Sequence, residues 1–146
     1  MAIHAERFTG RTEEYERYRL HYPRELLKLL RERCGLRGDH VIADVGAGTG
    51  MLAELFLENG NTVIAIEPNS EMRAGCGRLR ERYLQLSVVD ATAEATTLED
   101  ASVDFVAAGR AFHWFDQELA IGEFRRILRP DGWVVVAANG RSQRGI

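Results

Sequence analysis

The chain has 146 residues, of which 45% are apolar and 28% charged, and its formal net charge at pH 7 is −3. This length and composition are typical of one soluble globular domain with a real hydrophobic core. The weak negative charge gives no sign of the basic surface that binds nucleic acid or an anionic membrane. No apolar segment approaches the ~20 residues of a membrane span, and the polar N-terminus lacks the apolar region of a signal peptide.

Cysteine usage points to a reducing compartment. Cys34 and Cys76 are the two cysteines, and they have neither C-x-x-C spacing nor histidines placed as further metal ligands. We therefore expect reduced thiols in a cytoplasmic protein, with no disulfide framework and no metal site.

From residue 23 onward, amphipathic segments alternate with short apolar ones. Pro23 can begin a helix, because a first helical position needs no N–H, and Gly35 and Gly38 end it. Asn69 and Ser70 can cap a later helix. The predicted helices cover residues 23–34, 50–59, 71–82 and 116–128, and the predicted strands cover residues 41–45, 62–66, 84–89, 103–108 and 133–138.

Short, continuously apolar strands separated by helices are typical of βαβ units in a parallel sheet that is covered on both faces. Right-handed crossovers then give an α/β fold with a doubly wound, Rossmann-like sheet of five strands in the order 3-2-1-4-5. In such sheets the ligand lies beyond the carboxyl ends of the strands. Candidate site residues are therefore expected directly after each predicted strand.

A glycine-rich turn with G-x-G-x-G spacing (Gly46, Gly48, Gly50) follows the first predicted strand. Glycine lets the backbone turn sharply and approach a ligand closely. Dinucleotide-binding enzymes also use such a turn, but Met51 stands where their third glycine would be. Asp44, two residues before the turn, would suit an ammonium group and would repel a pyrophosphate. The turn therefore favours S-adenosyl-L-methionine (SAM) over NAD(P).

Two more carboxylates follow other predicted strands. Glu67 ends the second strand and could accept two hydrogen bonds from a ribose diol. After the third strand, Asp90 could accept a hydrogen bond from an adenine amino group while the N–H of Ala91 reaches a ring nitrogen. Alternatively, Asp90 caps its own turn.

At this level of detail the chain resembles the small-molecule class I SAM-dependent methyltransferases, in particular the group related to trans-aconitate methyltransferase. The motifs that carry the resemblance are ADVGAGTG (residues 43–50), IEPNSEM (66–72), VVDATAE (88–94), SVDFVAAGRAFHWFD (102–116) and EFRRILRPDGWVVVA (123–137). The resemblance implies an N-terminal lid over residues 1–22 and a SAM-binding methyltransferase domain over residues 23–146. In the lid, Arg19-Leu20 replaces the family's usual Arg-Pro.

The resemblance also implies a role for each motif. Asp44 and the glycine turn would hold the methionine part of SAM, Glu67 the ribose, and Asp90 with Ala91 the adenine. Residues Gly109 to His113, after the fourth strand, would line the methyl end, next to the acceptor. The predicted cofactor site comprises Tyr18, Arg19, Asp44, Gly46, Ala47, Gly48, Gly50, Glu67, Pro68, Met72, Asp90, Ala91, Gly109, Ala111 and Phe112, and the predicted substrate contacts are His113 and Trp114.

Methyl transfer is an in-line displacement on a sulfonium carbon, so the enzyme chiefly aligns the reacting atoms and excludes water. His113 is the candidate catalytic residue, as a general base. Alternatively, it packs in an aromatic wall around the cofactor with Phe112, Trp114 and Phe115, which would lie partly in the core and partly in the pocket lining. The sequence predicts methyl transfer to a small-molecule acceptor. The other possibilities are a non-catalytic SAM-binding or interaction module and, less favoured, an NAD(P)-binding oxidoreductase.

The resemblance further implies two strands after residues 133–138, and residues 139–146 have no strand character. We therefore expect a C-terminally truncated domain in which strand 133–138 is an exposed edge. Exposed edges pair readily with other chains. The sequence predicts self-association through this strand, unless the tail folds back over it.

Overall fold

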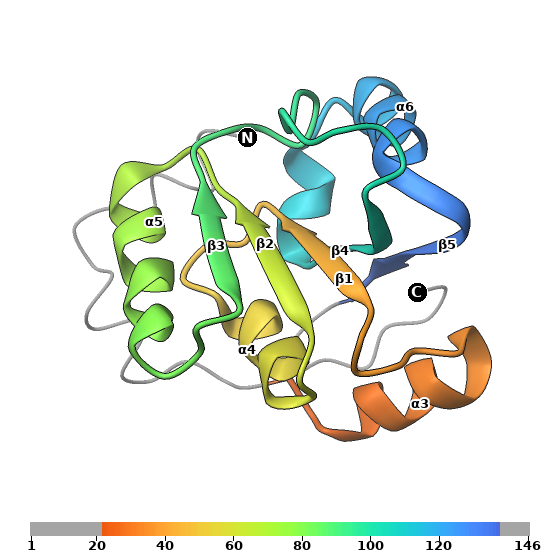
Figure 1. Cartoon of the computed structure of the whole chain (residues 1–146). Coiled ribbons are helices and arrows are strands. Elements are labelled where there is room, and N and C mark those ends of the chain that lie inside the picture. The colour runs from red at the N-terminus through yellow and green to blue at the C-terminus, as the bar shows by residue number, and fades with distance from the viewer. Residues whose placement is uncertain (1–21, 138–146) are drawn as a thin grey trace.

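A computed structural model describes residues 22–137 of the chain (Figure 1). Most predicted helices and strands are present with closely similar bounds. In chain order the elements are α3 (Glu25–Cys34), β1 (Val41–Val45), α4 (Met51–Glu58), β2 (Thr62–Ile66), α5 (Ser70–Gly77), the 3-10 helix η1 (Arg78–Glu81), β3 (Leu86–Val89), β4 (Val103–Ala108), the 3-10 helix η2 (Arg110–Trp114), α6 (Gln117–Ile127) and β5 (Leu128–Val136).

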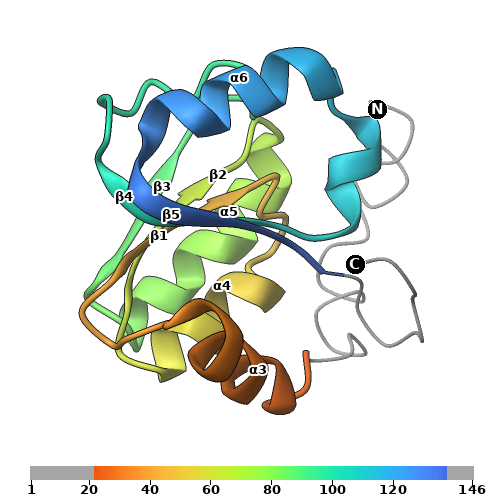
Figure 2. The same ribbon diagram turned by 90° about the vertical axis from the view of Figure 1, so that its right-hand side faces the viewer.

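The five strands form one sheet in the order β3-β2-β1-β4-β5. All neighbouring strands are parallel. Helices α3, α4 and α5 cover one face, and α6 with η2 covers the other (Figure 2). The predicted Rossmann-like α/β fold class and strand order are therefore confirmed.

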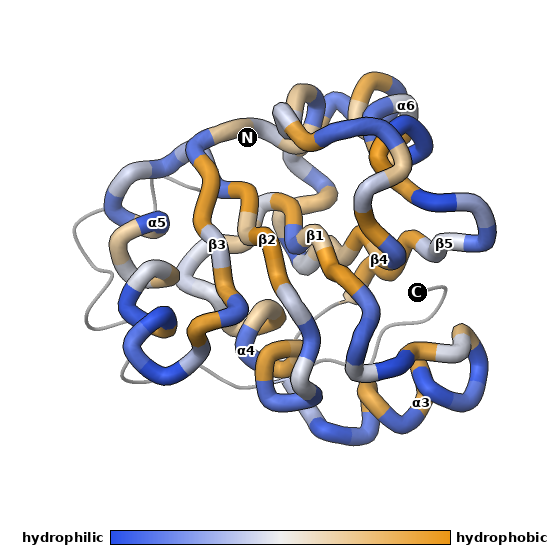
Figure 3. The backbone as a smooth tube through the Cα atoms, viewed as in Figure 1, coloured by the Kyte–Doolittle hydropathy of each residue, from blue (hydrophilic) through white to orange (hydrophobic). Residues whose placement is uncertain are grey.

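Each face of the sheet has its own apolar core. One core joins strand residues to side chains of α3, α4, α5 and η1, and the other joins the opposite strand faces to Ala120, Phe124 and Ile127 of α6. Because every central strand is buried on both sides, its sequence is continuously apolar rather than alternating. Hydrophobic residues accordingly concentrate along the strands in Figure 3.

Several predicted bounds differ from the structure, and the helix expected from Pro23 begins at Glu25. The helix expected over residues 71–82 ends at Gly77 and continues as the 3-10 helix η1, since Gly75 and Gly77 weaken an α-helix. The strand expected over residues 84–89 begins at Leu86. β5 begins at Leu128, five residues before the expected start. Its pairing with β4 shifts register between Val103 and Phe105, so the turn sequence before Trp133 lies within the strand.

The close fit of β5 on β4 depends on Gly132. A Cβ at this position would lie 2.9 Å from the backbone oxygen of Asp104. Within the described residues β5 is an edge of the sheet, and Trp133 and Val134 are 45% and 43% exposed. Self-association stays a prediction, because residues 138–146 lie outside the described part of the chain.

The predicted lid lies almost wholly before residue 22, where the description begins. Among the described residues, no helix is long and apolar enough to cross a membrane. The same residues bring together no group of three potential metal-ligating side chains.

Candidate functional site

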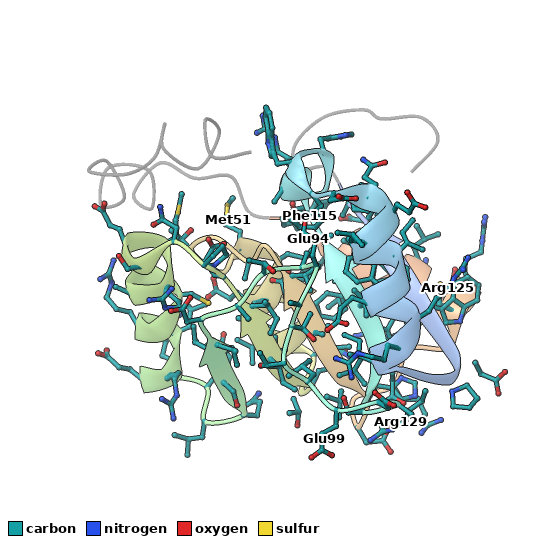
Figure 4. The ribbon with its side chains drawn as sticks, turned by 90° about the horizontal axis from the view of Figure 1, so that it is seen from above. Met51, Glu94, Glu99, Phe115, Arg125 and Arg129 are labelled. Atoms are coloured by element: carbon teal, nitrogen blue, oxygen red, sulfur yellow. The ribbon has the colours of Figure 1, made fainter. Side chains whose placement is uncertain are left out.

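A cavity of about 300 Å³ opens at the carboxyl ends of β1, β2 and β4. Met51, Glu94 and Phe115 reach it from three separate chain segments and gather in one region of Figure 4. Its position is the one that the doubly wound topology predicts for a ligand. Its lining residues are Tyr22, Asp44, Gly46, Ala47, Gly48, Thr49, Met51, Leu52, Glu67, Pro68, Met72, Thr92, Ala93, Glu94, Gly109, Arg110, Ala111, Trp114 and Phe115.

The glycine turn has the left-handed backbone that glycine adopts without steric cost. Gly46, Gly48 and Gly50 have φ values of 66°, 62° and 97°. A Cβ on Gly46 would lie 2.8 Å from Cβ of Ala111, so this glycine lets the turn pack beneath η2. A Cβ on Gly50 would lie 2.7 Å from Cδ1 of Leu79. Gly50 therefore allows α4 to pack closely against η1, and it does not line the cavity.

Asp44 and Thr49 are buried polar residues on the cavity wall, with exposures of 1% and 3%. Oδ2 of Asp44 and Oγ1 of Thr49 have no hydrogen-bond partner among residues 22–137. Burial, reinforced by the nearby Glu67 carboxylate, raises the pKa of Asp44 to about 8. A buried acceptor without a partner is unfavourable. A cationic group entering the cavity would satisfy it and favour its ionised form.

Glu67 connects β2 to the glycine turn. Its Oε1 accepts a hydrogen bond from N–H of Gly48 at 2.7 Å, and its Oε2 accepts one from N–H of Asn69 at 2.9 Å. Burial raises the pKa of this carboxyl. Each carboxylate oxygen can accept a second hydrogen bond. Glu67 can therefore brace the turn and still bind a diol.

The residues after β3 that line the cavity lie further along the chain than the sequence predicts. Asp90 is exposed and pairs with Arg73 at 3.2 Å, and neither Asp90 nor Ala91 belongs to the lining. The cavity is instead lined by Thr92, Ala93 and Glu94. Oε2 of Glu94 accepts a hydrogen bond from N–H of Asp116 at 2.7 Å. This bond joins the loop after β3 to the start of α6.

Helix η2 places its residues in different environments. Ala111 and Trp114 line the cavity, as expected for positions three apart in a 3-10 helix. Phe112 packs against the core beneath α6. His113 is exposed and lies outside the lining. Its ring contacts Phe112 edge-on, with centroids 6.4 Å apart.

The structure therefore brings most of the predicted site together, but not all of it. Asp44, Gly46, Ala47, Gly48, Glu67, Pro68, Met72, Gly109, Ala111 and Trp114 line one cavity. Gly50, Asp90, Ala91, Phe112 and His113 are outside its lining, and Tyr18 and Arg19 lie outside the described residues.

Several lining residues were not predicted. Tyr22 is 8% exposed, and a Cβ on Gly109 would lie 2.7 Å from its hydroxyl. In the sequence, Tyr22 follows Tyr15 and Tyr18 at helical spacing, and this pattern is the feature that could have indicated it. The others are Thr49, Met51, Leu52, Thr92, Ala93 and Glu94, which lie next to predicted site residues. Arg110, in the segment 109–113 expected at the methyl end, and Phe115, expected in the aromatic wall, also line the cavity.

The fold and cavity are those of an α/β protein whose candidate ligand site lies at the carboxyl edge of a parallel sheet. A family model described as a methyltransferase domain matches residues 43–136. The chain therefore belongs to the SAM-dependent methyltransferase family.

Individual proteins agree with this assignment. An uncharacterized methyltransferase of Mycobacterium bovis is 38% identical over 130 residues, which are 89% of this chain and 51% of that protein. The structure of a candidate type II methyltransferase from Anaeromyxobacter dehalogenans is 32% identical with a TM-score of 0.67, covering 82% of this chain and 49% of that one. A candidate SAM-dependent methyltransferase from Methanococcus maripaludis shares the fold, with a TM-score of 0.71 at 18% identity over 81% and 56% of the two chains.

The chain spans about half the length of the curated relatives it matches. The relatives support the cofactor class and the fold, and they leave the acceptor to be argued from this chain's own cavity.

Proposed function

We propose that this chain binds SAM in the cavity at the carboxyl ends of β1, β2 and β4 and supports methyl transfer to a small-molecule acceptor. The observation that carries the proposal is the buried, unpartnered Oδ2 of Asp44 on the cavity wall. SAM carries an ammonium group that would pair with this oxygen. The resemblance to the trans-aconitate methyltransferase group supports a small acceptor.

The surrounding residues suit the rest of the cofactor. Glu67 would accept from the ribose hydroxyls while it holds Gly48 in place. Met72 and the segment from Thr92 to Glu94 would enclose the adenine. The amino end of α4, directly behind the glycine turn, offers backbone N–H groups to the carboxylate of the methionine part.

The chemistry that SAM supplies is a methyl group on a sulfonium, which a nucleophile displaces in line. The protein's contribution is to hold donor and acceptor in line and to keep water out. Ala111, Trp114 and Phe115 form the apolar part of the wall at the end of β4.

Cys34 and Cys76 are free thiols, which supports a reducing, cytoplasmic setting.

The cavity fits NAD(P) less well. A pyrophosphate at the glycine turn would lie close to the buried Asp44, and ionised Asp44 would repel it. Met51 lines the cavity directly after the turn, where a dinucleotide-binding enzyme has its third glycine.

Calorimetric titration tests the proposal. The protein is titrated separately with SAM, S-adenosylhomocysteine, NAD⁺ and NADP⁺. We expect the first two to bind and the nicotinamide cofactors not to bind. Binding of NAD(P) without SAM would overturn the proposal, as would the absence of any SAM binding by folded protein.

A further inference from the structure

The charges on the cavity wall are unequal. The acidic lining residues are Asp44, Glu67 and Glu94, and Arg110 is the single arginine or lysine in the lining formed by described residues. Glu67 and Glu94 each accept hydrogen bonds from backbone N–H groups. Asp44 retains an oxygen without a partner. The acids therefore have structural or cofactor roles, whereas the role of the cation is open.

Arg110 makes no hydrogen bond or ion pair with any residue in the described part of the chain. Several other arginines there are engaged, such as Arg73, Arg82 and Arg126. A guanidinium presents a planar set of N–H donors that matches the two oxygens of a carboxylate. An unengaged guanidinium at a cavity is therefore suited to an oxyanion from a ligand.

The position of Arg110 indicates which ligand this is. It begins η2, directly after β4, whereas Glu67 and Met72 line the cavity from β2 and α5. β1 separates β2 from β4 in the sheet. Glu67 and Met72 thus lie on one side of β1 and Arg110 on the other. Trp114 and Phe115 share the side of Arg110 and provide aromatic surface.

We propose that Arg110 binds the carboxylate of the methyl acceptor, and that the acceptor is a small anion with an apolar or aromatic body. The aromatic side chains Trp114 and Phe115 bind that body, and Arg110 fixes its orientation. Arg110 is therefore a specificity-determining residue. This assignment rests on the proposed function, because it assumes that SAM occupies the part of the cavity near Asp44 and Glu67.

The methionine carboxylate of SAM is the other possible partner of Arg110. Gly46 packs beneath Ala111, so the methionine part and Arg110 are near each other. The amino end of α4 already suits that carboxylate, which leaves Arg110 for the acceptor. The experiment must separate these two sources of the same chemical group.

The probes are benzoate, phenylacetate and 3-phenylpropionate, each paired with its neutral amide. They are titrated by ligand-observed NMR into the complex with S-adenosylhomocysteine. The test variant is Arg110→Gln. Arg125→Gln is the matched control, since Arg125 is an exposed arginine of α6 that lies away from Met51, Glu94 and Phe115 in Figure 4. Calorimetry measures the affinity of both variants for S-adenosylhomocysteine and for methylthioadenosine, which lacks the amino-acid end.

We expect at least one carboxylate to bind the wild-type complex about tenfold more tightly than its amide, and Arg110→Gln to abolish this preference. Arg125→Gln should preserve it, and both variants should bind S-adenosylhomocysteine within about twofold of wild type. If no carboxylate is preferred, or if Arg110→Gln keeps the preference, the proposal is wrong. The proposal is also wrong if Arg110→Gln weakens the binding of S-adenosylhomocysteine but not that of methylthioadenosine, because Arg110 then binds the carboxylate of the cofactor. Failure of wild-type protein to bind S-adenosylhomocysteine at all would count against the proposed function instead.

Discussion

Two regions of the cavity are built in opposite ways. In the cofactor region (Asp44, the turn from Gly46 to Thr49, and Glu67) the two acids are almost completely buried, with Asp44 and Glu67 1% and 6% exposed. The acceptor region (Arg110, Ala111, Trp114 and Phe115) is more open, with Trp114 40% exposed. Backbone conformation and internal hydrogen bonds fix the cofactor region, whereas side chains that project from η2 and its end form much of the acceptor region.

This difference would let the acceptor region vary while the cofactor region stays the same. A buried site that depends on particular glycines and acids tolerates little change. Side chains on a connecting segment can change without cost to the core, so such segments commonly carry specificity. Substitutions in the cofactor region should therefore affect cofactor affinity most.

The largest effect is expected for Gly46→Ala. The φ of Gly46 is 66°, and the new methyl group would lie 2.9 Å from Cζ of Phe115. Relief of this clash would move η2 away from the turn, so we expect calorimetry to show SAM affinity reduced by about a hundredfold or more. Gly60→Ala is the matched control, because its φ is 94° with open space around the added Cβ. Equal losses of SAM affinity in the two variants would show that backbone strain, and not the clash with η2, causes the loss.

The next effect is expected for Glu67→Ala. The variant loses the ribose acceptor and also leaves the N–H groups of Gly48 and Asn69 without their partner. SAM affinity should fall by about ten- to a hundredfold, with the fold intact by circular dichroism. Glu99→Ala should have no effect, because Glu99 is exposed and lies away from the cavity in Figure 4. Unchanged affinity in folded Glu67→Ala protein would place the cofactor elsewhere.

A smaller, pH-dependent effect is expected for Asp44→Asn. In the folded protein the pKa of Asp44 is about 8, above its ordinary value of 3.8. Between these pH values the folded state holds a proton that the unfolded state has lost, so stability falls as pH rises through this window. Asparagine does not titrate. The melting temperature of the variant should therefore rise relative to that of wild type as the pH increases from about 6 to about 8.

Cofactor affinity should change in the opposite direction. Because the ammonium of SAM pairs with ionised Asp44, wild-type affinity should increase by about tenfold from pH 6 to pH 8, and binding should release a proton. Asp44→Asn should show neither effect when calorimetry is repeated in buffers of different ionisation enthalpy. Asp39→Asn, at an exposed residue before β1, should behave as wild type. A pH-independent wild-type affinity would contradict the proposed pairing.

The sequence predicted the parts of the molecule that local patterns determine. β1, β2 and β4 have the predicted bounds, since each is a short apolar segment whose burial on both faces leaves little choice of register. Asn69 caps α5 by accepting from N–H of Met72. Asp44 and Glu67 line the cavity, because the carboxyl ends of neighbouring parallel strands meet at one edge.

Contacts between distant residues determine the parts that the sequence did not predict. The Arg73–Asp90 ion pair and the bridge between Thr92 and Ala95 shape the turn after β3, and neither has a local sequence signal. The early start of β5 depends on the packing of Gly132 against β4.

The smallest effect is expected at His113, which tests the boundary of the acceptor region. His113 and Trp114 are consecutive residues of η2, but only Trp114 belongs to the cavity lining. A general base must come within hydrogen-bond reach of the acceptor, so His113→Phe should leave kcat at saturating acceptor within about twofold of wild type. Trp114→Ala should raise KM, because it removes the aromatic surface next to Arg110. A decrease in kcat of about a hundredfold in His113→Phe, with SAM affinity unchanged, would show instead that η2 turns this side chain inward when the acceptor binds. That result would add His113 to the acceptor region and make the chemistry, as well as the specificity, depend on η2.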